Sequence, residues 1–407
     1  MHEHRFSWLA TFLCFACIAM TTGLLSSSGL AHENEAVVEN KALKSLQKEI
    51  DRLRDEFQVP ALWAGKFYSD GRSVIAASGV RKWNNEVPVE VDDAVHIGSC
   101  TKAMTAVMIA QLCSKGLLSF ETTLSEIFST VDGLADSDWG KVTVADLLQH
   151  RSGAPANALW PILNFEHPGD PVAARRAMLD WLLKHNRPSE PKFLYSNVGF
   201  ALLGHIVESI DHEPWESLIA QRLFEPLGIK SAGFGPVGDS SQAENQEQQP
   251  GELDKPWGHV ASMGLVDMAR AIVGKPKVPN FTAVQIDNPP PLGPAGRVHL
   301  NLSDWSKFVL LFADENGYEK VNVKPEIWSR LLKVDGAGNY AGGWILMERE
   351  WAGGRTLFHN GSNTTWYCVA FVAPGKNYCL LAATNMFGDS AAKVCDKAVV
   401  AAIAVGF

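Results

Sequence analysis

A serine and a lysine three residues apart, Ser99 and Lys102, stand where the sequence predicts the start of a buried helix. Between Ala103 and Cys113 only two residues are polar, and a helix that is apolar on nearly all sides belongs in a protein core. Burial and the positive end of the helix dipole both oppose an ammonium group there, so the neutral amine becomes more accessible. Because residues three apart share a helix face, the Ser99 hydroxyl can meet that amine, and the pair predicts an activated nucleophile.

The Ser-x-x-Lys spacing alone is not specific, because it occurs at four places in the chain. The pair that starts at Ser45 lies in an amphipathic helix with a solvated lysine, and the pair at Ser189 contains a proline that favours a loop. The pair at Ser390 opens the last predicted helix, where its lysine can point outward. For the first pair discussed, the structural alternative is that Ser99 caps the helix while Lys102 extends to solvent.

Two further segments carry side chains that could serve such a nucleophile. Tyr195 and Asn197 stand just before an apolar helical run, where a phenol can shuttle a proton and an amide can hold a substrate peptide bond. The structural alternative is a turn in which Asn197 caps the helix. His359 and Gly361 lie between two predicted C-terminal strands, and a glycine there lets a backbone N–H approach a reacting carbonyl. His-x-Gly also occurs elsewhere in the chain, and its place at the rim of the predicted sheet favours His359.

Together these three motifs resemble those of the serine penicillin-recognising superfamily, which includes class C β-lactamases, D-alanyl-D-alanine peptidases and related esterases. Their order along the chain matches that family, and the stretches 143–153, 224–229 and 294–296 also look familial. The resemblance spans about residues 40–400 and implies an α+β fold of the β-lactamase/transpeptidase type.

One motif departs from the β-lactamase pattern. Where β-lactamases carry Lys-Thr-Gly, this chain has His359-Asn360-Gly361, and histidine at that place resembles D,D-peptidases, D-amino-acid peptidases and esterases of the family. Asn360 also replaces the usual hydroxyl, which is expected to loosen a preference for acidic substrates. The resemblance therefore favours a peptidase or esterase over an efficient β-lactamase.

The resemblance implies an acyl-enzyme mechanism. Ser99 would attack an acyl carbonyl while Lys102 and Tyr195 share the proton transfers, and the backbone N–H groups of Ser99 and Ser362 would bind the oxyanion. The predicted substrate-binding residues are Asn197, His359, Gly361 and Ser362. No cofactor and no metal are expected, because the sequence has no His-Glu-x-x-His and no phosphate-binding glycine loop.

Three functions are compatible with these residues. The first is a secreted or periplasmic serine hydrolase that acts on an ester or a D-amino-acid peptide bond. The second is a catalytically silent module that binds cell-wall peptide, and the third is a true class C-type β-lactamase. The complete set of Ser99, Lys102 and Tyr195 favours catalysis, because a silent module has no need of all three. The expected partner is a small-molecule or peptidoglycan-peptide substrate, and a net charge of -9 without a dense basic run argues against nucleic acid.

The first 31 residues have the pattern of a secretory signal peptide. A basic residue, an apolar stretch over 8–20 and small residues at 29–31 follow one another, which predicts a secreted or periplasmic protein with no stable membrane insertion after cleavage. An uncleaved anchor is the alternative. Five cysteines follow this segment, an odd number that predicts mostly buried free thiols. Among them Cys100 is expected to point about 100° away from Ser99 around the helix and to serve in packing.

Strand patterns gather at both ends of the chain and helical patterns fill its middle. With 407 residues and 46% hydrophobic residues, the chain can form one large or two interleaved domains. We predict an antiparallel sheet domain from residues 32–80 and 300–407, flanked by terminal helices, and an inserted, mostly helical domain with long loops over 81–299. The proline-rich stretch 275–296 is predicted to be an extended connector.

Overall fold

The computed structural model describes residues 39–185, 187, 192–237, 255–261, 280–336 and 338–406. The predicted signal segment, 1–31, lies outside them. The strands are β1 (Ala61–Tyr68), β2 (Ser73–Gly79), β3 (Val95–His96), β4 (Gly233–Phe234), β5 (Gly258–Ala261), β6 (Phe281–Val284), β7 (Val298–Leu300), β8 (Tyr340–Ala341), β9 (Trp344–Arg349), β10 (Gly354–Ser362), β11 (Tyr367–Ala373) and β12 (Tyr378–Thr384). The α-helices after the helical residues 39–57 are α2 (Thr101–Ser114), α3 (Leu124–Ile127), α4 (Val144–Leu148), α5 (Trp160–Glu166), α6 (Pro171–Leu183), α7 (Asn197–Asp211), α8 (Trp215–Ile219), α10 (Gly293–Gly296), α11 (Leu302–Val309), α12 (Pro325–Leu331) and α13 (Asp389–Ala404).

The central sheet is built from both ends of the chain. Its seven strands follow the order β2-β1-β12-β11-β10-β9-β8, and all neighbours are antiparallel. The N-terminal hairpin β1–β2 therefore joins the C-terminal strands through β12, where Leu62 pairs with Thr384. The predicted α+β fold with a sheet from both chain ends is confirmed.

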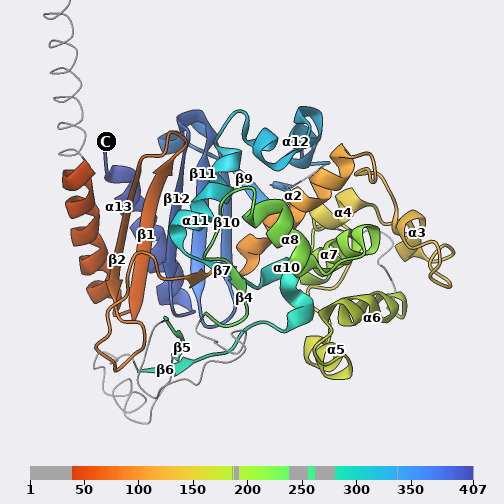
Figure 1. Cartoon of the computed structure of the whole chain (residues 1–407), viewed down its shortest axis with the longest axis horizontal. Coiled ribbons are helices and arrows are strands. Elements are labelled where there is room, and N and C mark those ends of the chain that lie inside the picture. Colours follow the sequence, from red (N-terminus) through yellow and green to blue (C-terminus); the bar gives the residue numbers. More distant parts are fainter. Residues whose placement is uncertain are drawn as a thin grey trace, which may run out of the picture.

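The two faces of this sheet are covered differently (Figure 1). The helical residues 39–57 and α13 pack on one face, where Leu46, Ile50, Leu380 and Val394 share one apolar cluster. The opposite face carries a larger cluster that includes α2, α7 and the other helices of the middle of the chain. Because successive residues of a strand point to opposite faces, alternate residues of β10 belong to the two different clusters.

Helix α2 is enclosed along its whole length within the larger cluster. All fourteen of its residues are buried, which agrees with its nearly continuous apolar sequence. A short 3-10 turn, Gly98–Cys100, leads into it from β3. Ser99 therefore lies immediately before the N-terminal end of a helix that is buried in the core.

The proline-rich stretch differs from the extended connector that was predicted. It contains β6, a 3-10 turn at Pro290–Leu292 and the short helix α10, which packs against α2 and α7. Prolines occupy the first turn of both short helices, where the missing backbone N–H is tolerated, so proline content here starts helices rather than extending the chain. The predicted domain boundaries themselves stay a prediction. Within the described part of the chain, none of the helices is both long and apolar enough to cross a bilayer.

Candidate active site

Ser99 and Lys102 meet as their spacing predicts. The Lys102 Nζ lies within hydrogen-bond distance of Ser99 Oγ, at 3.1 Å, and it donates to Asn197 Oδ1 and to the carbonyl of Ala295, both at 2.7 Å. Ser99 makes no side-chain cap at the start of α2, and Lys102 has no exposed surface. The alternative of a capping serine beside a solvated lysine is therefore wrong.

The environment of Lys102 disfavours its charged form. Burial lowers the pKa of the amine from 10.5 to about 7, and no carboxylate contacts the Nζ atom among its described partners. At neutral pH a large share of the amine is consequently unprotonated. An unprotonated amine within hydrogen-bond distance of a serine hydroxyl can accept its proton.

Tyr195 and Asn197 lie at the start of α7, close to this amine. Ser196, between them, is the residue that caps the helix, with its hydroxyl accepting from Gly199 N, so the predicted alternative of Asn197 as the cap is wrong. Asn197 instead bridges Lys102 and Asn157, whose Oδ1 accepts from the Asn197 amide at 2.9 Å.

The Tyr195 ring packs 4.9 Å from Lys102 Nζ, measured to the ring centroid. Burial raises the pKa of the Tyr195 hydroxyl above its ordinary value, and the nearby Ser99 hydroxyl acts in the opposite direction. Among the described residues this hydroxyl has no well-aligned hydrogen-bond partner. A phenol in this state stays protonated at neutral pH and is free to donate.

The third motif lies on β10, with its residues on alternating faces of the sheet. His359 is almost fully buried, and its Nε2 lies 3.1 Å from the Tyr340 hydroxyl, while its ring centroid is 6.2 Å from that of Tyr195. Asn360 points to the opposite face, where its amide donates to the Tyr367 hydroxyl at 3.0 Å. His359 therefore contacts Tyr340 rather than the Tyr195 oxygen, and the middle residue of the motif is turned away from Ser99.

The end of β10 packs directly against the turn that carries Ser99. A Cβ atom on Gly98 would clash with the backbone nitrogen of Ser362, and one on Gly361 would clash with the carbonyl oxygen of Ile97. Gly98 also has a φ of +47°, a conformation that favours glycine. The backbone at Ser99 and at Ser362 thus comes from two distant parts of the sequence and converges because glycines allow it.

Several groups around these residues were not predicted as part of the site. The Ala295 carbonyl is a partner of Lys102, and the familial look of the stretch 294–296 was the signal that pointed to this segment. The His150 ring packs between those of Tyr195 and Tyr340 in tilted arrangements, with centroid distances of 4.3 and 4.4 Å, and its Nδ1 accepts a hydrogen bond from Ser196 N. His150 lies within the segment 143–153, so the familial look of that segment was the signal that could have identified it.

The remaining candidate chemistry lies elsewhere or is absent from the described residues. Cys100 is buried, with its Sγ 3.8 Å from Cys368 Sγ, and all five cysteines beyond the N-terminal segment are free and buried, as predicted. The described residues contain no group of three or more His, Cys, Asp or Glu suited to a metal ion.

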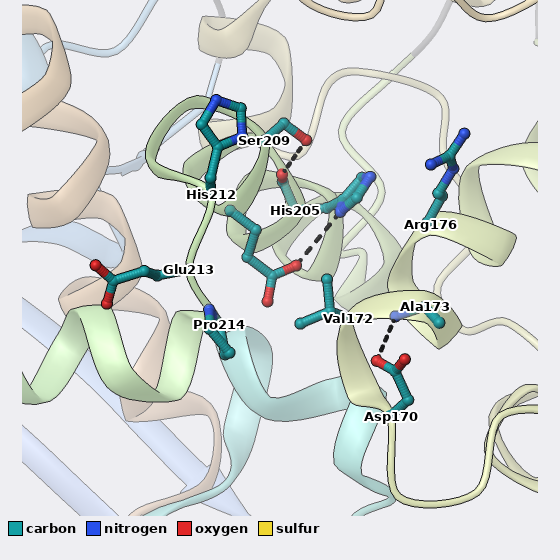
Figure 2. A pocket seen from close by; sticks show the side chains of 10 residues that line it. Asp170, Val172, Ala173, Arg176, His205, Ser209, His212, Glu213 and Pro214 are labelled. Carbon is teal, nitrogen blue, oxygen red and sulfur yellow. Dashed lines mark hydrogen bonds and ion pairs between the residues drawn. The ribbon is translucent and has the colours of Figure 1, made fainter.

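A pocket of about 520 Å³ lies between the start of α6 and the end of α7, and its lining includes His205, Arg176 and His212 (Figure 2). It contains none of the predicted site residues.

Known proteins resemble this chain, some over most of its length and others over less than half of it. The family described as Beta-lactamase matches residues 64–404. Penicillin-binding protein 4 of Amycolatopsis lactamdurans is 25% identical over 350 residues, which are 83% of this chain and 84% of that protein. The D-alanyl-D-alanine-carboxypeptidase/endopeptidase AmpH of Escherichia coli K12 is 25% identical over 177 residues, 41% of this chain and 43% of that protein. Among solved structures, the D-amino acid amidase from Ochrobactrum anthropi SV3, complexed with L-phenylalanine amide, has a TM-score of 0.66 at 18% identity and covers 89% of this chain and 97% of its own.

Proposed function

Since the chain belongs to the Beta-lactamase family, we propose that it is a serine hydrolase that forms an acyl-enzyme with an ester or a D-amino-acid peptide substrate. The observation that carries this proposal is the contact between Lys102 Nζ and Ser99 Oγ at 3.1 Å, made by an amine whose pKa burial lowers to about 7. A serine whose neighbour can take its proton at neutral pH is a competent nucleophile.

The proton path follows from the state of each group. The neutral Lys102 amine takes the Ser99 proton as Oγ bonds to the acyl carbon, and the carbonyl oxygen becomes an oxyanion held by the N–H groups of Ser99 and Ser362. The protonated Tyr195 hydroxyl then donates to the leaving group as the bond to that group breaks. Lys102, now an ammonium, returns the proton to Tyr195, and a water hydrolyses the acyl-enzyme by the reverse sequence.

The substrate class is inferred from the third motif. His359 stands where β-lactamases carry a lysine, and the Asn360 amide donates a hydrogen bond to the Tyr367 hydroxyl on the far face of the sheet. No hydroxyl of that motif is thus directed at a substrate carboxylate. This disfavours substrates whose binding depends on a carboxylate at that position, β-lactams among them, and supports an ester or a D-amino-acid amide or peptide that binds without that contact. Relatives named as a D-alanyl-D-alanine carboxypeptidase and a D-amino acid amidase support the same choice. The proposed location is secreted or periplasmic, with residues 1–31 as the signal peptide.

The experiment compares purified wild type with Ser99→Ala. Both proteins are treated with a fluorophosphonate probe and with a labelled penicillin, and are then assayed on an ester, a D-alanyl peptide and a cephalosporin. We expect the wild type alone to be labelled, at Ser99, and to hydrolyse the ester or the peptide faster than the cephalosporin. Equal labelling of the two proteins rejects the hydrolase. Labelling by penicillin without turnover of any substrate supports the silent binding module, and efficient cephalosporin turnover supports the β-lactamase.

A further inference from the structure

A buried carboxylate that no catalytic motif contains lies behind the turn of Ser99. Asp287 precedes α10, and its side chain is 2% exposed. Its Oδ1 lies 2.8 Å from His96 Nε2 and accepts a hydrogen bond from the Asn363 amide at 3.0 Å, while its Oδ2 lies 3.3 Å from Arg297 Nε. Burial raises the pKa of this carboxyl, but the contacts with His96, Arg297 and Asn363 outweigh burial and hold the pKa below its usual range. Asp287 is therefore an anion held between three polar side chains.

One arm of this network reaches the nucleophile. His96 is fully buried on β3, and its Nδ1 accepts a hydrogen bond from the backbone N–H of Gly98 at 3.1 Å. Because Nδ1 is an acceptor, the ring proton must reside on Nε2, next to the Asp287 carboxylate. That N–H is not well aligned with the carboxylate oxygen, so the contact is electrostatic rather than a regular hydrogen bond. Asp287 nevertheless favours the tautomer that binds the residue before Ser99.

The other arm reaches the segment after Ser362. The Asn363 amide donates to Asp287, and its Oδ1 accepts from the backbone N–H groups of Thr365 and Trp366 and from the Thr365 hydroxyl, at 2.9 to 3.1 Å. These contacts fix the turn between β10 and β11. The side chain that follows Ser362 is thus fully satisfied and held in one orientation.

The two arms end at the two backbone segments that converge in the candidate active site. Gly98 and Ser362 are in contact. The Asp287 carboxylate contacts His96, which binds the Gly98 N–H, and it accepts a hydrogen bond from Asn363, which follows Ser362. We propose that Asp287, acting through His96 and Asn363, is a positioning residue that sets the separation and direction of the backbone N–H groups of Ser99 and Ser362. This inference rests on the proposed function, in which those two groups bind the oxyanion.

The reaction rate depends strongly on the positions of the donors that bind the oxyanion. It does not depend directly on a salt bridge that only stabilises the core. The loss of one such donor lowers kcat by about 100- to 1,000-fold, and an error of about 1 Å in position can cost about 100-fold. A network that only stabilised the fold would change the fraction of folded protein, while each folded molecule would react as the wild type does.

The test therefore measures reaction rates per active site. Wild type, His96→Leu, His96→Asn and Asp287→Asn are each inactivated with a fluorophosphonate, the fraction of labelled Ser99 is counted by mass spectrometry, and the kinetics are separated into kinact and KI. His205→Leu is the matched control, because His205 is a buried histidine beside a carboxylate, with its Nδ1 3.3 Å from Glu208 Oε2, in the pocket away from Ser99 (Figure 2). Its kinact is expected to equal that of the wild type.

We expect His96→Leu to lower kinact by roughly 30-fold or more with KI within about 3-fold of the wild type, since tetrahedral phosphonylation uses the same donors. His96→Asn should recover most of the loss, because its Oδ1 can accept the Gly98 N–H in place of Nδ1. Asp287→Asn keeps the shape of the carboxylate and should lower kinact by about 10-fold. If His96→Leu does not fold, the Asp287→Asn variant provides the test.

The positioning role is overturned if kinact is unchanged in Asp287→Asn. It is also overturned if kinact of His96→Asn is no higher than that of a folded His96→Leu. A wild type that is labelled while the variants react normally rejects this role alone. A wild type that is not labelled at Ser99 rejects the proposed function and this role together.

Discussion

Two buried lysines lie on opposite faces of the central sheet, and their surroundings differ. Lys66 on β1 is 6% exposed, donates to the backbone carbonyl of Val405 at 3.0 Å and lies 4.7 Å from the centroid of the Tyr378 ring. Lys102 on α2 is fully buried, and its Nζ lies within hydrogen-bond distance of a hydroxyl, a side-chain amide oxygen and a backbone carbonyl. An aromatic face attracts an ammonium, whereas a hydroxyl offers a proton to a neutral amine. A buried lysine is therefore a candidate base because of its neighbours and not because of its burial alone.

The largest expected effect separates these two lysines. Lys102→Met should lower the second-order rate of fluorophosphonate labelling by about 1,000-fold, because the general base is lost. Lys66→Met, the matched control on the other face, should stay within roughly 3-fold of the wild type. Equal effects of the two substitutions would remove the distinction between the two lysines.

The next effect compares two tyrosine hydroxyls, one on each side of the sheet. Tyr195→Phe should lower turnover of an ester substrate by about 100-fold, since the proton donor to the leaving group is lost. Tyr367→Phe removes a hydroxyl that accepts a hydrogen bond from the Asn360 amide on the opposite face, and turnover by this variant should remain within roughly 2-fold of the wild type. Steady-state kinetics on both variants checks this, and full activity of Tyr195→Phe would exclude it as the proton donor.

A smaller effect concerns the pH dependence of stability. The pKa of Lys102 is about 7 in the folded chain against 10.5 when unperturbed, so the unfolded chain binds more protons between these values. The free energy of unfolding of the wild type should therefore rise as pH increases from about 7 to 10.5. Below about pH 7 the full penalty of charging the buried amine is present. Lys102→Met should lack this rise, so its stability relative to the wild type should fall by a few kcal/mol over the window. Denaturant titrations at several pH values measure the difference, and a pH-independent difference would show that the amine is not desolvated.

The smallest effect concerns the thiol beside the nucleophile. Cys100 packs toward Cys368 and the carbonyl of His359 rather than toward Lys102 Nζ. Cys100→Ala should leave the labelling rate within roughly 2-fold of the wild type and cost about 1 kcal/mol of stability. If labelling is lost in this variant and retained in Ser99→Ala, the thiol is the nucleophile.

The regular parts of the fold could be predicted from the sequence. Helix α13, Asp389–Ala404, and strand β12, Tyr378–Thr384, coincide with hydrophobic patterns that are visible in the sequence. Burial of α2 followed from its nearly complete lack of polar residues, and the contact between Ser99 and Lys102 followed from helix periodicity. Local patterns were sufficient wherever one element determines the geometry.

The long-range parts of the site could not be predicted. Strands β3 and β4 have two residues each, too few for a periodic pattern, and they exist because β7 lies between them. The contacts of Asp287 with His96 and of Lys102 with the Ala295 carbonyl join residues almost two hundred positions apart. Such pairs depend on how the elements pack, and nothing in the spacing of the sequence marks them.

The pH dependence of fluorophosphonate labelling at Ser99 tests the central claim most directly, because it reports the protonation state of the group that activates the hydroxyl. The rate constant for labelling, measured from pH 5 to 10 under conditions where the protein stays folded, should rise with a single midpoint near 7, the pKa to which burial brings Lys102. A rate that continues to rise toward pH 10, as an ordinary solvated lysine requires, or that is unchanged in Lys102→Met, would contradict the account.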